Sequence, residues 1–302
     1  MLLNKKIPFK YLFDQIKYDL LRVLILSASF FIIKTFIIAY PPLPAVLPAI
    51  LGTSISLLLA FKLNQSYDRW WEARKIWGEI NNDSRSLILE IKGFISDTSL
   101  RENQTQLLLR QMSFRQIGWC YCLGQALRAQ NPVENLEGFV SQKELDELEG
   151  QNNIPLYLLM LQMNDLKKLH RDNSINDYQQ IKIQDTITRL CNSMGKSERI
   201  NSTVFPATYG KFIRFFIYLF LATLSMVLVE TAGIWEIPIL IIIATPFFLL
   251  EKSAVLMQDP FRNRPTDTPV TTIARNIEIN IKQLLHEKDV PQPLQPESFY
   301  LM

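Results

Sequence analysis

Four stretches of apolar residues dominate the hydrophobic pattern of the chain, at positions 23–40, 45–61, 215–229 and 237–250. The first stretch carries one charged residue, Lys34, and the other three carry none. A helix needs about 20 mostly apolar residues to cross the hydrocarbon core of a bilayer. Together with their flanking residues, the stretches therefore predict four transmembrane helices at 21–40, 45–63, 212–230 and 234–252.

Buried helices of a large soluble core are the alternative, because apolar runs of about 14 residues also occur there. The four stretches form two close pairs, joined by Pro41-Pro42-Leu43-Pro44 and by Thr231-Ala232-Gly233. Connectors this short suit membrane hairpins, so the pattern favours the membrane interpretation.

The basic residues predict how the chain is oriented. The two short connectors contain no lysine or arginine, and only Glu230 and Glu236 lie at their rim. The opposite ends of the stretches are flanked by Lys5, Lys6, Lys10, Lys17, Arg22, Lys62, Arg69, Arg74, Lys75, Lys211, Arg214, Lys252, Arg262 and Arg264. Because positive loops stay inside, we expect both termini in the cytoplasm and a multi-pass protein of the inner (plasma) membrane. No small-residue cleavage site closes the first stretch, so we expect it to be retained as a helix.

The residues outside the four stretches predict further helices and few strands. Apolar residues recur at helical spacing in segments 68–95, 100–128, 141–148, 155–169, 177–199 and 272–286. Segment 259–269 is a proline-rich loop. We therefore expect an all-α protein, one unit over 1–302, with a helical cytoplasmic part formed by 64–210 and 253–302.

Composition excludes several functional classes. The net charge of the 302 residues is only +3, which is too weak to indicate a nucleic-acid partner. The three cysteines are odd in number and lie in the predicted cytoplasmic part, so we expect free thiols. His170 and His286 lie in polar helical segments and are expected at the surface. The sequence has no phosphate-binding glycine loop, zinc pattern or hydrolase elbow, so we expect no enzyme activity, cofactor or metal.

Lys34 is the one charge inside a predicted span, about seven residues from its outer end. An ammonium group near the middle of a bilayer costs roughly 2.5 kcal/mol or more. Three interpretations remain open: the side chain reaches the membrane surface, faces a partner, or lines the vestibule of a pore.

The second span has one face with a distinct character. Thr53, Leu57 and Phe61 lie at i, i+4 and i+8 and therefore share that face, which Gln65, Asp68 and Glu72 roughly continue. Several copies of this helix around an axis would form a narrow apolar collar above an acidic, amide-lined entrance. Spacing alone, however, favours the alternative that Leu57 and Phe61 pack against neighbouring helices.

Three motifs resemble those of the bestrophin family. Residues 64–77 are similar to the stretch after the second membrane helix of bacterial bestrophin-like proteins, and their core is Arg69-Trp70-Trp71. Ser197-Glu198-Arg199-Ile200, followed by Pro206, is similar to the motif before the third span. Asp259-Pro260-Phe261 resembles the motif after the fourth span.

This resemblance implies a homopentameric, largely helical channel with one central pore in a lipid bilayer. The neck of that pore falls on Thr53, Leu57 and Phe61, the face that the spacing also indicates. The family further implies a constriction at the cytoplasmic end, which we place at Ile181 with Tyr178 as the reserve. Calcium activation is not expected, since Arg262-Asn263-Arg264-Pro265-Thr266-Asp267 cannot supply the oxygen ligands that Ca²⁺ requires.

The sequence thus predicts a passive channel for monovalent ions, Na⁺, K⁺ or Cl⁻. Asp68 and Glu72 below the neck favour cations, as bacterial members of the family suggest, whereas animal members suggest anions. Arg69 could pair with an acid or stack on an indole ring. A secondary transporter and a membrane scaffold without conductance are the alternatives, and the lack of an inverted repeat is evidence against the transporter.

Overall fold

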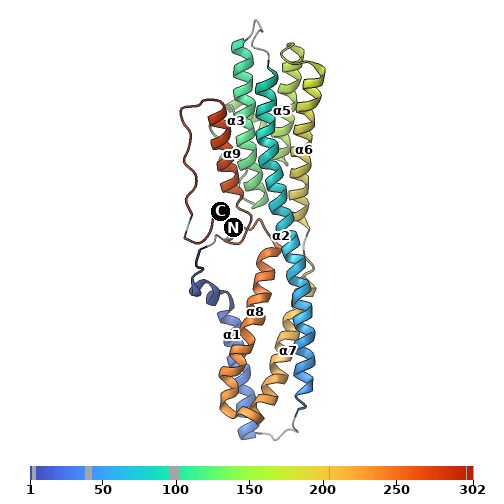
Figure 1. Ribbon diagram of the computed structural model, residues 1–302, viewed down its shortest axis with the longest axis vertical. Coiled ribbons are helices and arrows are strands. Elements are labelled where there is room, and N and C mark those ends of the chain that lie inside the picture. Colours follow the sequence, from blue (N-terminus) through green and yellow to red (C-terminus); the bar gives the residue numbers. More distant parts are fainter. Residues whose placement is uncertain (2–4, 38–42, 96–101, 204, 297, 302) are drawn as a thin grey trace. The chain divides into compact units, whose positions relative to one another are not determined.

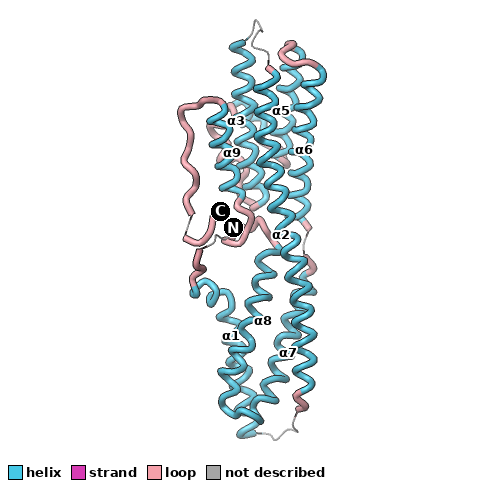
Figure 2. The backbone as a smooth tube through the Cα atoms, in the orientation of Figure 1, coloured by secondary structure: helices cyan, strands magenta, loops and turns pink. Residues whose placement is uncertain are grey.

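The computed structural model describes residues 1, 5–37, 43–95, 102–203, 205–296 and 298–301. Their helices are α1 (Phe9–Ile32), a π-helix (Ile33–Ile37), α2 (Val46–Phe94), α3 (Glu102–Leu127), α4 (Gln142–Leu148), α5 (Ile154–Arg171), α6 (Asp177–Ser202), α7 (Ala207–Ala232), a 3₁₀ turn (Gly233–Trp235), α8 (Glu236–Gln258) and α9 (Val270–Leu284) (Figure 1). These ranges contain no β-strand, as the lack of magenta segments in Figure 2 shows, and an isolated bridge joins Glu137 and Val140. The prediction of an all-α protein is confirmed.

The chain divides into two compact units. Unit 1 contains Met1–Leu3, Trp71–Thr203 and Pro260–Met302, and unit 2 contains Asn4–Trp70 and Val204–Asp259. Helix α2 contributes its first half to unit 2 and its second half to unit 1.

Helix α2 is longer than the sequence pattern predicts. We expected a span ending near residue 63 and a separate helix from 68, but Val46–Phe94 is one helix of 49 residues. Residues 62–67 contain neither proline nor glycine, and the Ser66 hydroxyl donates to the Lys62 carbonyl oxygen at 2.7 Å, so nothing interrupts the helix. At 1.5 Å per residue α2 is about 74 Å long, more than twice the hydrocarbon thickness of a bilayer.

Unit 2 packs α1, α7, α8 and the first half of α2 around an apolar core. Its buried residues are Ile16, Val23, Ile55, Leu59, Ile213, Ile217, Phe220, Leu221, Leu240, Ala244 and Phe248. Gly52 of α2 allows Phe220 of α7 to approach closely, because a Cβ on Gly52 would lie 3.0 Å from the Phe220 ring. Gly233, with φ +56°, ends α7 in a conformation that glycine adopts most readily.

The predicted spans correspond to helices of unit 2. The span at 21–40 falls on α1 and the π-helix, and its end at 38–40 lies outside the described residues, as do Pro41 and Pro42 of the connector. The span at 212–230 falls within α7, and the span at 234–252 begins in the 3₁₀ turn and continues in α8. By length and apolar composition, the two continuous helical runs Val46–Phe94 and Ala207–Gln258 are each able to cross a membrane.

Unit 1 is built from the predicted aqueous helices. Helix α3 packs against α5, α6 and α9, and α5 packs against α6 (Figure 1). Side-chain caps fix where these helices begin: Ser141 and Asn176 form capping boxes for α4 and α6, and Asn153 caps α5. The segment predictions agree with these helices to within a few residues.

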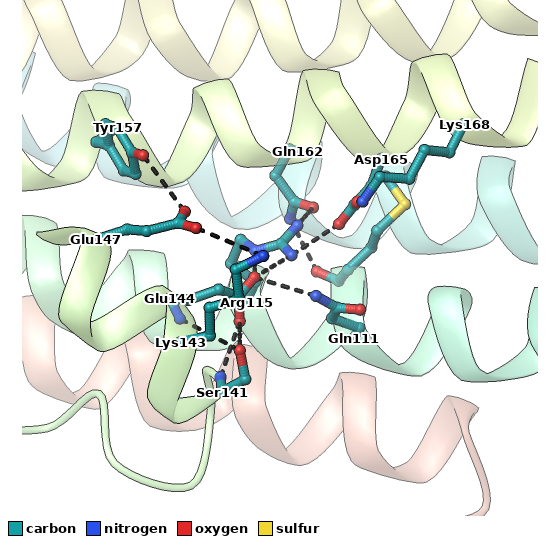
Figure 3. Close-up of polar contacts among 11 residues, drawn as sticks. Gln111, Arg115, Ser141, Lys143, Glu144, Glu147, Tyr157, Gln162, Asp165 and Lys168 are labelled. Carbon is teal, nitrogen blue, oxygen red and sulfur yellow. Dashed lines mark hydrogen bonds and ion pairs between the residues drawn. The ribbon is translucent and has the colours of Figure 1, made fainter.

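A buried arginine organises the polar part of unit 1. Arg115 of α3 has 1% of its surface exposed and is ion-paired with Glu144 of α4 and Asp165 of α5 (Figure 3). Its Nη1 also donates to Gln162 Oε1 at 3.1 Å, and Lys168 pairs with Asp165 at 2.6 Å. Because every charge in this network has a partner, it joins three helices without leaving a carboxylate buried alone.

Candidate functional site

The predicted neck residues lie on the uncovered face of α2. Leu57 and Phe61 have 58% and 53% of their surfaces exposed, and Thr53 is exposed as well. Ile55 and Leu59, on the other side of the same helix, are 2% and 3% exposed in the core of unit 2. The alternative that Leu57 and Phe61 are packed within their own subunit therefore does not hold.

The hydroxyl of Thr53 is already bonded within its own helix. Its Oγ1 donates to the Ala49 carbonyl oxygen at 2.9 Å, and Ser56 Oγ donates in the same way to Gly52 at 2.8 Å. Both bonds satisfy the donor of a small polar residue inside an apolar span. Thr53 thus offers the exposed face less hydrogen-bonding capacity than its residue type suggests.

An ion-pair cluster lies immediately behind this face. Lys62 is the residue after Phe61, yet its side chain is 0% exposed and its Nζ lies 3.0 Å from Glu251 Oε1 of α8. The second oxygen of Glu251 accepts from Arg214 Nη2 of α7, also at 3.0 Å. Glu251 therefore links α2, α7 and α8. Lys62 and Arg214 were noted in the sequence as basic residues that flank spans, and the structure adds that both are ion-paired with Glu251.

Arg69 connects two of the sequence motifs. Its Nε donates to the Gln258 carbonyl oxygen at 2.5 Å, at the last residue of α8, and it interacts electrostatically with Asp259. Burial lowers the pKa of Arg69, and the charge of Asp259 partly offsets this effect. The guanidinium stays charged and satisfies a carbonyl that the helix end leaves without an intrahelical donor. Arg69 therefore interacts with an acid, as one of the two sequence interpretations proposed.

The other motif residues lie at helix ends or, for Trp70 and Trp71, within α2. Pro206 is the N-cap of α7 and Asp259 is the C-cap of α8. The Pro260 carbonyl oxygen accepts from the Thr268 backbone N–H at 3.1 Å, and Phe261 is 1% exposed in the core of unit 1. The Trp70 ring lies tilted against the Tyr67 ring, with 6.0 Å between the ring centroids, and Trp71 keeps 46% of its surface exposed.

The predicted acidic entrance is partly neutralised. Gln65 and Asp68 are exposed on α2, but Glu72 is paired with Lys75 at 2.7 Å. Further along α2, within unit 1, Glu79 pairs with Lys196 at 3.0 Å and Asp83 pairs with Arg189 at 2.9 Å. These four residues, together with Arg199, line a groove of about 700 Å³ between α2 and α6. Two acids and three bases share this groove, so it is not acidic.

The predicted cytoplasmic constriction lies at the beginning of α6. Tyr178 and Ile181 have 85% and 64% of their surfaces exposed and belong to unit 1. Whether the two residues narrow a conduit remains a prediction.

Two acids near the predicted outer connectors have partners that the sequence does not indicate. Lys34 is paired with Glu230 at 2.7 Å, so of its three interpretations the one with a partner is correct. Glu236 was expected at the rim, but it is 0% exposed and accepts hydrogen bonds from Ser27 at 2.8 Å and Ser225 at 3.0 Å. The expectation was wrong because the two serines face inward from α1 and α7, and no local pattern around Glu236 shows this.

The loop after Phe261 contains one buried carboxylate. Asp267 is 1% exposed, and its Oδ2 accepts from the Arg264 backbone N–H at 3.0 Å. Burial raises the pKa of Asp267, although the hydrogen bond and the nearby arginines oppose that shift. Throughout the described residues, no group of three or more His, Cys, Asp or Glu side chains is arranged to hold a metal. Calcium independence therefore remains a prediction that rests on the sequence of this loop.

Comparison with known proteins identifies relatives that match most of the chain. A sequence model described as Bacterial/Fungal Bestrophin protein matches residues 11–283. The voltage-dependent anion channel-forming protein YneE of Escherichia coli O157:H7 is 29% identical over 252 residues, which are 83% of this chain and 80% of the relative. The voltage-dependent anion channel-forming protein alr2987 of Nostoc sp. (strain PCC 7120) is 27% identical over 247 residues, covering 82% of this chain and 78% of the relative.

A solved structure has the same fold. The crystal structure of a bacterial bestrophin homolog from Klebsiella pneumoniae superposes with a TM-score of 0.82 and covers 91% of this chain and 100% of its own. The sequence identity is 20%, so this likeness establishes the fold. With a family model that spans most of the sequence and this shared fold, the chain belongs to the bacterial/fungal bestrophin family.

Proposed function

We propose that the chain forms a membrane ion channel whose pore neck is built from Thr53, Leu57 and Phe61. The observation that carries the proposal is the uncovered apolar face of α2, which is opposite a face buried in unit 2. A Leu and a Phe left more than half exposed in one subunit must be covered by lipid or by other copies of the chain. In a symmetric ring of copies, this face would form a hydrophobic constriction of the kind that gates by dewetting.

A ring of five copies is the assembly that the family resemblance favours. The exposed side chains of Tyr178 and Ile181 on α6 would form the second, cytoplasmic constriction of the same conduit. We place both termini in the cytoplasm of a cell whose inner membrane the chain crosses four times. The support for this topology is the distribution of lysine and arginine around the four apolar stretches.

Monovalent ions are the proposed cargo, and the sign of their charge needs a measurement. Asp68 is an exposed acid whose negative charge would favour the passage of cations. Glu72, the second acid of the predicted entrance, is paired with Lys75, so its negative charge is partly neutralised. The relatives carry the name of anion channels, which does not support a cation preference. No enzyme activity is proposed, in keeping with the non-enzymatic character of the family.

Flux through liposomes tests the neck assignment. The purified chain, reconstituted into vesicles, should conduct Na⁺, K⁺ or Cl⁻, and Leu57→Ala with Phe61→Ala should increase the flux by widening the neck. Ile242→Ala is the matched control, because Ile242 of α8 is 71% exposed but does not lie on α2. Equal flux from the double variant and from the wild type would remove the neck assignment.

The same preparation separates the two rival functions. A secondary transporter would give saturable flux coupled to a counter-ion, and neither neck substitution should raise it. A scaffold would give no conductance from a pure, homogeneous oligomer. Asymmetric NaCl across a planar bilayer assigns selectivity, since the reversal potential has opposite signs for cation and anion preference.

A further inference from the structure

Two arginines on different helices of unit 2 have accessible guanidinium groups near the beginning of their spans. Arg22 of α1 has 63% of its side chain exposed, and Arg214 of α7 has 37% exposed. The two groups lie close enough for the positive charge of one to act on the other. Like charges repel, so the surrounding fold must hold both groups in place.

A buried acid anchors each of these arginines. Nη1 of Arg22 donates to Oδ1 of Asp19 at 3.1 Å, and the same oxygen accepts from the Tyr218 hydroxyl at 3.0 Å. Nη2 of Arg214 donates to Oε2 of Glu251 at 3.0 Å. Asp19 and Glu251 are 5% and 1% exposed, so the acids lie inside the helix bundle and the arginines extend outward from them. A guanidinium has five N–H donors, so each arginine keeps further donors for an acceptor outside the protein.

The charges of this cluster do not cancel. Lys62, Arg22 and Arg214 contribute three positive charges, whereas Asp19 and Glu251 contribute two negative charges. Three minus two leaves one net positive charge, which a single monoanion would neutralise. Lys62 is fully buried against Glu251, so the excess charge is accessible only at the two arginines.

Exposed apolar side chains flank both arginines. Leu21 and Ile25, one residue before and three residues after Arg22, are 51% and 58% exposed, and Phe215, next to Arg214, is 60% exposed. Apolar side chains that lie this open in a membrane-spanning helix need an apolar cover. A small anion in water would neutralise the arginines but would leave these side chains uncovered. An amphiphile with an anionic head would meet both requirements.

We propose that Arg22 and Arg214 together bind the phosphodiester of an anionic phospholipid. Its oxygens would accept charge-assisted hydrogen bonds from both guanidinium groups, and its acyl chains would cover Leu21, Ile25 and Phe215. Basic pockets between transmembrane helices at the cytoplasmic side are known to bind anionic lipid headgroups. The lipid would relieve the repulsion between the arginines and would join α1 to α7. Its place in the inner leaflet rests on the proposed topology, but its binding does not depend on ion conductance.

Thermal unfolding of the full-length protein in neutral detergent tests the proposal with three matched probes. Dihexanoyl phosphatidylglycerol has an anionic headgroup and acyl chains. Dihexanoyl phosphatidylcholine has the same chains and phosphodiester but a compensating cation, and glycerophosphoglycerol has the anionic headgroup without chains. Phosphatidylglycerol should raise the unfolding temperature saturably, whereas the other two should raise it much less.

Three variants locate the binding site. Arg22→Gln should weaken phosphatidylglycerol binding by about tenfold or more, because one of the two charged donors is lost. Arg214→Lys keeps the positive charge beside Glu251 but loses the planar guanidinium, so it should weaken binding as well. Lys17→Gln is the control, because Lys17 pairs with Asp14 three residues before it at 2.9 Å, just as Arg22 pairs with Asp19. Lys17 lies about 140° around α1 from Arg22, so this variant should bind the lipid as the wild type does.

Two results would overturn the proposal. One is an equal shift of the unfolding temperature with phosphatidylcholine or with glycerophosphoglycerol as with phosphatidylglycerol. The other is an equal phosphatidylglycerol affinity for Lys17→Gln and for both arginine variants, which would show diffuse attraction or no site at all. A lack of conductance in liposomes, in contrast, would remove the proposed channel and leave this lipid site in place.

Discussion

Lys62 and Glu251, 189 positions apart in the sequence, form an ion pair of 3.0 Å in which both side chains are almost fully buried. The pair lies in unit 2 directly behind Phe61, the last residue of the proposed neck. Glu251 also holds Arg214, so two cations share one carboxylate. Three helices are joined at the level where the exposed apolar face of α2 ends.

Removal of Lys62 should destabilise the protein strongly. Lys62→Met breaks a buried ion pair and leaves Glu251 with Arg214 alone, and breaking a buried pair typically costs about 3–5 kcal/mol. The thermal unfolding temperature in detergent should therefore fall by several degrees. Lys252→Met is the control, since Lys252 is the neighbour of Glu251 in sequence but is only partly buried. Similar unfolding temperatures for the two variants would show that the pair contributes little.

The Glu144 carboxylate should make stability depend on pH. Burial pushes the pKa of Glu144 upward, but the Ser141 backbone N–H and the Arg115 guanidinium outweigh it and hold the pKa below its usual value. A carboxyl with a depressed folded-state pKa stabilises the fold above its unfolded pKa of about 4.3, and this contribution is lost as the pH falls through the folded pKa. The difference in unfolding temperature between the wild type and Glu144→Gln should be largest near pH 7 and should shrink below about pH 4.3. A difference that stays constant from pH 7 to pH 3 would contradict this assignment.

That Thr53, Leu57 and Phe61 share one face of α2 could be predicted from the sequence, because it depends only on residue spacing along one helix. Thr53, Leu57 and Phe61 repeat every four residues, and a helix places them together whatever surrounds it. The helices of unit 1 were predictable for a similar reason, since Ser141, Asn153 and Asn176 mark their beginnings locally.

The polar contacts of unit 2 could not be found in this way. Lys62 looks like one of several basic residues that flank a span, and only its distant partner Glu251 shows that it is buried. Glu236 likewise follows a short connector and has the sequence context of a rim residue. Its burial depends on Ser27, which lies 209 positions away. Periodicity gives the face of a helix, but it does not identify which distant residue covers that face.

Asp68 should influence which ions pass the proposed channel. It is an exposed acid on the face of α2 that continues from the neck, and a ring of such carboxylates would favour cations. Asp68→Asn should move the reversal potential in asymmetric NaCl toward that of an anion-selective pore. Asp146→Asn, an equal change of charge at an exposed position on α4, should leave the reversal potential unchanged. A reversal potential that is the same for wild type and Asp68→Asn would remove Asp68 from the ion path.

Thiol labelling should separate the three cysteines. All three are free, as the sequence predicts, but Cys120 and Cys122 are 0% exposed in the core of unit 1 whereas Cys191 on α6 is partly exposed. Burial raises the pKa of the Cys120 thiol to about 12, although Ser84 and Gln116 oppose it, and burial alone raises the pKa of Cys122 to about 12. The thiolate is the reactive form, so neither buried cysteine should react near pH 7.5 while the fold is intact.

Mass spectrometry after a short maleimide treatment should show one label on the native protein and three after denaturation. Cys191→Ser should then show none in the native state, whereas rapid native labelling of Cys120 or Cys122 would mean that α3 opens to solvent.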